Sequence, residues 1–208
     1  NTPKQIHLYR LFGREPPVFA HLPMILGADG KKLSKRHGAT AVADWQHEGI
    51  LPEAMVNFLA LLGWSPGGEF AEVMTIDELI AKFNADGLLK KASIFDVKKL
   101  EWMNGQHLAQ LPVERLEPLV TSILLQEGLA TKPELAALDD RYRRALAILR
   151  TRVRSVKDLA LQVPTYLRVS YDESAVSKAW SAPADAIHVV DMARDTVSTT
   201  GWDPPAIE

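Results

Sequence analysis

Cysteine is absent from this sequence of 208 residues, which excludes disulfides, thiol nucleophiles and cysteine-based zinc sites. The 6 histidines are too scattered to give metal-ligand spacing, so we predict no metal site. Apolar runs stay far below the roughly 20 residues that a membrane-spanning helix needs, and no charged and apolar leader opens the sequence. We therefore expect a soluble, cytoplasmic protein with no membrane partner.

A strong net charge is also lacking, but the charge distribution is uneven. The formal net charge is −2, with 24 basic and 26 acidic residues. Residues 31–36 contain 4 of the bases and residues 141–157 contain 7 with no acid among them, which leaves 13 bases against all 26 acids elsewhere. Positive charge is thus concentrated in two short segments, and an anionic ligand is expected at each. With 47% hydrophobic residues, the chain is long enough to fold around one or two cores.

The first residues predict a helix at the start of the sequence. Thr2 at the N-cap and Gln5 at N3 have the pattern of a capping box, which predicts a helix from Pro3 toward Phe12 that stops at Gly13. A natural chain seldom begins with Asn on such a cap. We therefore expect the sequence to be a piece of a longer protein, with a processed N-terminus as the alternative.

Helix signals continue along the chain, and the period-two alternation of strands is nearly absent. The segment from Pro52 to Gly63 is apolar nearly all round and predicts a buried helix. Thr75 and Glu78 form another capping-box pattern. A domain boundary is expected at Pro112 and a second break at Val163 and Pro164, and further helices are predicted near 95–104, 113–127 and 132–150.

The first basic cluster follows a turn with two glycines, at residues 27–30. Three lysines, an arginine and a serine within residues 31–36 can surround a polyphosphate, because ammonium groups act as point charges and hydroxyl or backbone N–H groups donate directionally. A solvated basic loop has the same composition and is commoner. Composition alone therefore leaves both interpretations open.

The second basic cluster lies beside an apolar seam. Tyr142, Leu146, Leu149, Val153 and Val156 are spaced by four, three, four and three residues, as on one face of a helix. One interpretation is a continuous helix with a basic stripe. The other is a break near residue 152 with a new helix capped at residue 155. Arginines suit phosphate oxygens and base edges of RNA, whereas a solvated helical face is the plainer interpretation.

Residues 32–36 have the order KLSKR, and further short motifs precede and follow them within residues 1–110. In order and spacing these motifs resemble the bacterial glutamyl-tRNA synthetases, which are class I aminoacyl-tRNA synthetases, and KLSKR is similar to the KMSKS signature of that class. The similarity is highly specific over residues 1–110, moderate to about 170 and weak after that. The segments that carry it are residues 1–6, 17–23, 32–39, 51–54, 57–59, 62–65 and 95–104.

The resemblance implies roles for the first cluster. It gives Lys35 the part of stabilising the ATP phosphates while glutamate attacks the α-phosphate and pyrophosphate leaves, which is electrostatic catalysis by a closing loop. Lys32 and Ser34 help to hold that loop, and Arg36 belongs to the same ATP site. Two further residues, Met24 and Ile25, fall where the family approaches adenine, although core positions in a strand explain them more simply. Mg²⁺ is expected with ATP, and no zinc is expected in this segment.

One departure from the family limits the activity expected of the chain. The HIGH-type motif and the glutamate pocket of the family lie in a first half of the catalytic domain that this sequence does not contain. We therefore predict that the chain alone neither activates glutamate nor charges tRNA.

The resemblance also assigns the second cluster and favours the helix break there. It implies that tRNAGlu is contacted near the anticodon by Arg143, Arg150, Arg152 and Arg154. Arg152 falls at the position associated with accepting tRNAGlu and rejecting tRNAGln. This suggests a discriminating enzyme.

The predicted fold is mainly α. It comprises the C-terminal end of a Rossmann catalytic domain (1–30), the KMSKS loop with an α-rich stem-contact domain (31–111), and an incomplete helical anticodon-binding domain (112–208). The predicted function is that of part of a glutamate–tRNA ligase, a monomer whose full-length form uses ATP, glutamate and tRNAGlu. The alternative is a non-catalytic helical RNA-binding module descended from a synthetase, which an upstream reading frame without a HIGH-type motif would favour.

Overall fold

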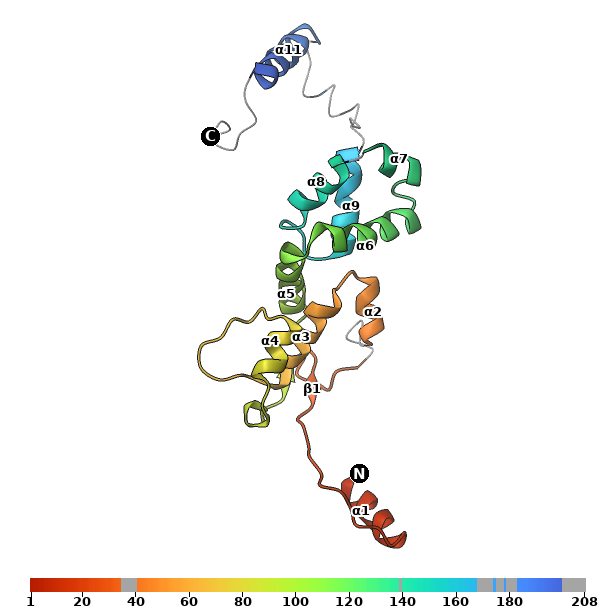
Figure 1. Cartoon of the computed structure of the whole chain (residues 1–208), viewed down its shortest axis with the longest axis vertical. Helices are drawn as coiled ribbons and strands as arrows, with labels where there is room; N and C mark the ends of the chain where they lie inside the picture. Colours follow the sequence, from red (N-terminus) through yellow and green to blue (C-terminus); the bar gives the residue numbers. More distant parts are fainter. Residues whose placement is uncertain (35–40, 139, 168–173, 175–177, 179–182, 200–208) are drawn as a thin grey trace. The chain divides into compact units, whose positions relative to one another are not determined.

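The computed structural model is mainly helical, as the sequence predicts (Figure 1). It describes residues 1–34, 41–138, 140–167 and 183–199, with the single residues 174 and 178. The chain divides into two compact units, residues 1–167 and 168–208. In the second unit the helix α11 spans Pro183–Thr199. All packing described below lies within the first unit.

The first helix, α1, spans Thr2–Leu11 and begins one residue earlier than predicted. Asn1 is the N-cap and makes no side-chain capping bond, so the capping box predicted on Thr2 is wrong. The Thr2 hydroxyl instead lies 3.3 Å from Nε2 of His21. The predicted stop is confirmed, because Gly13 takes a positive φ of 62° that ends the helix. No residue of α1 is buried.

Two short strands form a parallel pair between distant parts of the chain. The strand β1, Ile25–Leu26, pairs with β2, Ser93–Ile94, with Ile25 opposite Ser93. The chain then turns back, because Gly27 N–H donates to the Lys31 carbonyl at 2.8 Å and Leu33 N–H to the Ile25 carbonyl at 3.0 Å. In the described part of the chain these are the named strands, which agrees with the predicted scarcity of strands.

The helices after the first basic cluster are α2, Val42–His47, α3, Pro52–Gly63, and α4, Ile76–Lys82, followed by the 3₁₀ turn η2, Ala85–Gly87. The bounds of α3 are those predicted, but its burial is one-sided because Val56 is 43% exposed. The predicted capping box of α4 is confirmed: Glu78 N–H donates to the Thr75 hydroxyl at 3.2 Å and Thr75 N–H to the Glu78 carboxylate at 2.7 Å.

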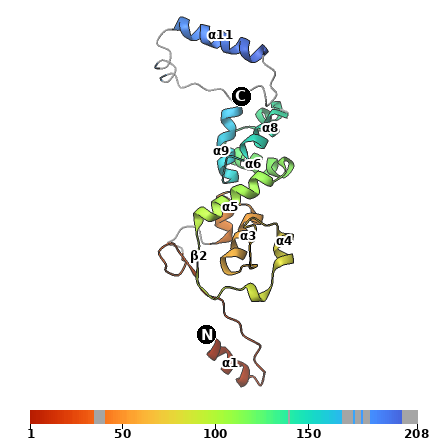
Figure 2. The same ribbon diagram turned by 90° about the vertical axis from the view of Figure 1, so that its left-hand side faces the viewer.

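A helical bundle follows α5, Val97–Gln110, which runs from beside α3 to the start of α6 (Figure 2). The bundle contains α6, Val113–Gln126, α7, Lys132–Ala137, α8, Asp140–Leu149, and α9, Val156–Leu167. The single helix predicted over 132–150 is therefore two helices. The break predicted at Pro164 is wrong, because α9 continues through it. Val163 just before it is fully buried, and the packing of α9 on α6 compensates for the backbone bond that proline lacks.

One continuous core holds the body of this unit together. Its buried side chains run from Ile50 to Val163 and come from both sides of Pro112. Pairs of helices in contact include α3 with α5 and α6 with α8 and α9. A second, smaller core consists of Trp64, Met74 and Leu79.

Candidate functional site

The described part of the first basic cluster lies directly after the turn at residues 27–30, which follows β1 and which we call the β1 turn. Asp29 accepts the Lys31 N–H at 3.0 Å, and Leu33 packs against the main core. Lys32 and Ser34 on either side of this anchor are exposed. Their side chains are thus held near β1 while facing outward. The predicted residues Lys35 and Arg36 lie outside the described residues.

The two residues predicted near adenine lie at the start of this turn. Met24 is 57% exposed and Ile25, in β1, is 39% exposed. Neither side chain is buried within the residues that the structure describes, and the plainer interpretation, two core residues of a strand, also stays a prediction. Their contact with adenine remains a prediction.

The second basic cluster contains the predicted helix break. Helix α8 ends at Leu149 and α9 begins at Val156, and the Ser155 hydroxyl accepts the Asp158 N–H at 3.0 Å as an N-terminal cap. We call residues 150–155 the arginine turn. It carries three arginines on a loop between helices, so the interpretation as one continuous helix is wrong.

The four predicted arginines have different environments. Arg143, on α8, donates to Glu117 of α6 at 2.7 Å in an exposed ion pair. Arg150 is half-buried and its guanidinium donates to the Leu111 carbonyl, while its Nε is buried without a hydrogen-bond partner. Arg152 and Arg154 are exposed. Among the described residues, no carboxylate forms a salt bridge with either of them.

Arg152 and Arg154 border a groove of about 860 Å³. Lys157 joins two of its walls, because its ammonium lies 3.3 Å from the Glu48 carboxylate. The groove is thus lined by charged side chains of both signs together with apolar ones. Its lining comes from α2, the loop before α3, α5, the arginine turn and α9, and includes Trp45, Glu48, Ile50, Val97, Glu101 and Val153.

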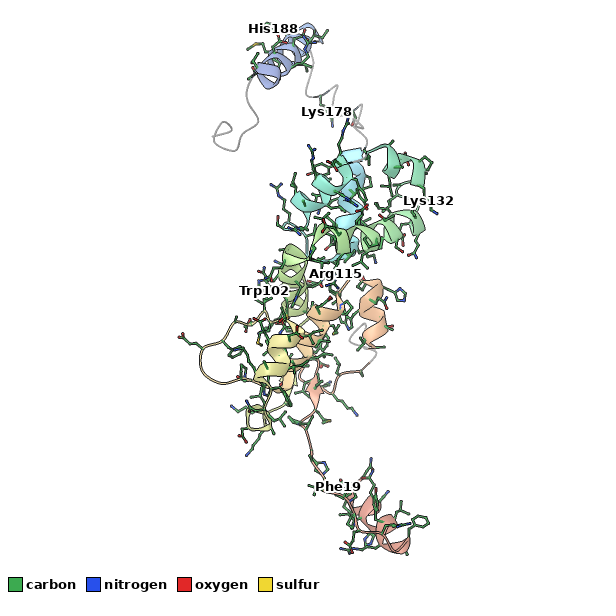
Figure 3. The ribbon with its side chains drawn as sticks, in the orientation of Figure 1. Phe19, Trp102, Arg115, Lys132, Lys178 and His188 are labelled. Carbon is green, nitrogen blue, oxygen red and sulfur yellow. The ribbon has the colours of Figure 1, made fainter. Side chains whose placement is uncertain are left out.

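A charged cluster lies where α3, α5 and α6 meet. Arg115 of α6, which is labelled in Figure 3, reaches Glu53 of α3 at 2.5 Å. Burial alone would raise the pKa of Glu53, but the hydrogen bond and charge of Arg115 hold that pKa below its ordinary value. Burial lowers the pKa of His107 on α5, which the Glu53 charge partly opposes. His107 Nε2 lies 3.0 Å from the amide oxygen of Asn57, a fully buried residue.

Two buried asparagines escaped the sequence analysis. Asn57 and Asn104 are both 0% exposed, on α3 and α5. A sequence signal existed for Asn104, since it lies four residues from the apolar residues Leu100 and Leu108 on the same helix face. A polar side chain at such a position must find hydrogen-bond partners inside the fold.

The described ranges contain neither a candidate membrane span nor a candidate metal site. No helix there has the length and apolar character to cross a membrane. No group of three or more histidine, aspartate and glutamate side chains is arranged to hold a metal ion within those same residues.

Known proteins are similar to this chain in both sequence and fold. Residues 1–102 match the family model described as tRNA synthetases class I (E and Q), catalytic domain. Over 201 residues the chain is 43% identical to the glutamate–tRNA ligase of Desulforudis audaxviator, covering 95% of this chain and 40% of that protein. The chain is thus similar to the class I tRNA synthetases, and within that class to the glutamate–tRNA ligases.

Other matches extend over nearly the whole chain. The glutamate–tRNA ligase of Moorella thermoacetica is 41% identical over 202 residues, which are 96% of this chain and 41% of the relative. A crystal structure of a glutamate tRNA ligase from Elizabethkingia meningosepticum matches with a TM-score of 0.73 and 28% identity, over 99% of this chain and 44% of that one. The chain thus spans about two fifths of the length of these curated relatives.

Proposed function

We propose that the chain is part of a glutamate–tRNA ligase that activates glutamate with ATP and transfers it to tRNAGlu. The observation that carries the proposal is the 43% identity to a glutamate–tRNA ligase across 95% of the chain, a span that holds both basic clusters. The same match supports a division into the end of the catalytic domain (1–30), a stem-contact domain (31–111) and a helical anticodon-binding domain (112–208). We expect the ligase to act as a monomer.

In this proposal the first basic cluster binds the phosphates of ATP. Lys35 stabilises the negative charge that develops on the phosphates as pyrophosphate leaves, and Lys32, Ser34 and Arg36 hold the loop and the nucleotide. The support for this assignment is the fixed position of Leu33. Its N–H donates to the Ile25 carbonyl and its side chain packs against the main core, two residues before Lys35 in the sequence. Met24 and Ile25 are exposed beside the β1 turn, where an adenine ring could lie on them.

Mg²⁺ is proposed to accompany the phosphates of ATP. The described residues contain no cluster of acidic and histidine side chains that could hold the ion. The ATP phosphates themselves are expected ligands of the ion.

The arginine turn is proposed to contact the anticodon region of tRNAGlu. Arg152 and Arg154 are the strongest candidates, because both are exposed and without an ion-pair partner among the described residues. A guanidinium presents several donors in one plane, which suits the edge of an unpaired base. Arg143 contributes charge from α8, whereas Arg150 fixes the turn to Leu111.

The tRNA proposal is tested by Arg152→Gln in the full-length ligase. We expect the preference for tRNAGlu over tRNAGln, measured as the ratio of kcat/KM values, to fall by about tenfold or more, since a bidentate contact to a base is worth about 1 to 3 kcal/mol. Arg144→Gln is the matched control, because Arg144 is an exposed arginine of α8 that pairs with Asp140. An unchanged ratio in Arg152→Gln would contradict the assignment.

The prediction that activity requires the upstream half of the catalytic domain is tested with the 208-residue chain alone. We expect no ATP–pyrophosphate exchange from it, and exchange from the protein that also carries the upstream half of the catalytic domain. Exchange by the chain alone would refute this part of the proposal. A full-length protein that binds tRNAGlu without charging it would favour the non-catalytic RNA-binding module.

A further inference from the structure

Asn104 joins three segments of the chain at the base of the arginine turn. Its amide oxygen accepts the Leu51 N–H at 2.8 Å. Its amide nitrogen donates to the Gly49 carbonyl at 3.2 Å and to the Arg154 carbonyl at 2.6 Å. The side chain therefore links α5 to the loop before α3 and to the arginine turn.

These contacts specify asparagine at position 104. The amide has two N–H donors and one carbonyl acceptor, and all three are used here. The orientation of the amide is fixed by its partners, because a backbone N–H faces the oxygen and two backbone carbonyls face the nitrogen. Aspartate would set a carboxylate against the carbonyls of Gly49 and Arg154, and leucine would leave buried backbone groups unpaired.

Gly49 lets the backbone at the start of α9 come close to the loop before α3. Its φ is +79°, and a Cβ there would lie 2.6 Å from Lys157 N and 3.0 Å from Val156 N. The Gly49 carbonyl also accepts the Val156 N–H at 3.0 Å. The loop before α3 and the start of α9 are thus in direct backbone contact.

The arginine turn is held at both ends by these bonds. Arg150 is tied to the Leu111 carbonyl at the start, and the Arg154 carbonyl is tied to Asn104 at the end. Val153 is buried in the main core between them. The backbone of Arg152 is therefore fixed from both sides while its side chain remains exposed.

We propose that Asn104 is a positioning residue for tRNA recognition. It fixes the arginine turn so that Arg152 and Arg154 meet the RNA in one preformed arrangement, which avoids the entropy cost of ordering a loop on binding. The inference rests on the proposed contact between this turn and tRNAGlu. It assigns a role in tRNA choice to a residue that cannot itself touch the tRNA, since its side chain is fully buried.

Asn57 provides a matched control for Asn104. Both are 0% exposed asparagines on neighbouring helices. Asn57 accepts the Met74 N–H at 2.8 Å and donates to the Glu72 carbonyl at 3.0 Å, so it also bonds to the backbone. Met74, Glu72 and its third partner His107 all lie outside the arginine turn. Removing either amide should weaken folding, but only one removal should disturb the turn.

The experiment compares Asn104→Ala with Asn57→Ala in the full-length ligase. Both variants should have a lower Tm. For Asn104→Ala we expect KM for tRNAGlu to rise by about tenfold and the preference over tRNAGln to fall by a similar factor, since small misplacement of a contacting group costs one to two orders of magnitude. Its KM values for ATP and glutamate should match those of Asn57→Ala. Equal tRNA kinetics in the two variants would overturn the proposal.

A second pair of variants tests the contact between the loop before α3 and the start of α9 without a substitution at Asn104. Gly49→Ala should displace the start of α9 and reproduce the tRNA effect. Gly67→Ala is its control, because Gly67 has a similar φ of +77° but open space around a Cβ. This pair decides the question if Asn104→Ala does not fold, and tRNA kinetics no different from those of Gly67→Ala would then overturn the proposal.

The outcomes separate this inference from the proposed function. A wild-type ligase that does not charge tRNAGlu contradicts the proposed function itself, and this inference with it. A wild-type ligase that charges and discriminates, with Asn104→Ala behaving like Asn57→Ala, contradicts only the role of Asn104.

Discussion

Helix α1 and the helices of the main core are equally regular but differ in what surrounds them. In α1 no residue is buried, and Leu11 is 81% exposed. In α8, of the same length, Leu146 is 0% exposed and belongs to the main core. Local signals define where α1 begins and ends, whereas α8 is also held by its neighbours α6 and α9. The same kind of side chain should therefore matter little in one helix and greatly in the other.

The sharpest test of this difference exchanges one leucine in each helix. Leu146→Ala should lower the free energy of unfolding by about 2 to 5 kcal/mol, because it leaves a cavity in a packed core. Leu11→Ala should change it by less than about 0.5 kcal/mol. Urea denaturation of the chain followed by circular dichroism measures both. Similar losses would mean that α1 is packed as tightly as α8.

A glycine pair sharpens the comparison within the body of the chain. A Cβ at Gly87 would collide with the Ser65 carbonyl oxygen and with Trp64 Nε1, whereas a Cβ at Gly63 would meet nothing within 4 Å. We expect Gly87→Ala to cost about 1 to 3 kcal/mol, since overpacking forces the neighbours to move. Gly63→Ala should be neutral or stabilising by up to about 1 kcal/mol. The shift in Tm of each variant checks this, and a stable Gly87→Ala would show that the turn can widen.

Loss of a helix cap should have a smaller effect. Thr75→Ala removes the hydroxyl that accepts the Glu78 N–H, which should cost about 1 kcal/mol. Thr2→Ala is the counterpart in α1, where the hydroxyl is not part of a cap, and should cost less. Chemical denaturation compares the two, and a larger loss for Thr2→Ala would restore the capping role predicted for it.

The smallest effect is expected from pH. Burial lowers the pKa of His107, so the unfolded chain binds a proton at a higher pH than the folded chain does. The associated stability is fully present above the ordinary histidine pKa of about 6.5 and is lost as pH falls through the lower folded pKa. Unfolding free energies between about pH 7.5 and 5.5 should decline less in His107→Gln than in the wild type. Identical slopes would contradict the assignment to His107.

Much of the fold could be predicted where the signal is local. Pro52 and Gly63 mark the two ends of α3, and the Thr75 pattern marks the start of α4. The prediction at Thr2 was wrong because the helix begins one residue earlier, with Asn1 at the N-cap, and asparagine is also a favoured residue at that position. At Pro164 the tertiary packing of Val163 overrides a local breaker.

The candidate site, too, could be predicted from the sequence only where the signal is local. The charge count located both basic clusters. The Ser155 pattern left the helix break as one of two interpretations, and the resemblance favoured that break, which the structure confirms. The inward direction of Arg150 could not be predicted, because its partner Leu111 lies 39 positions earlier in the sequence. The bonds of Asn104 to residues 49 and 154 are likewise long-range and appear only when the chain has folded.

The continuous core also governs how the protein can be divided. The boundary predicted at Pro112 does not separate two cores, because one core contains side chains from both sides of it. Truncation there would strip apolar cover from α6 and leave the Arg154 carbonyl without its amide donor. We expect a protein that begins at residue 112 to aggregate, and size-exclusion chromatography showing a monomer would disprove this. A cut before Ile50 would instead keep the residues of that core on a single polypeptide.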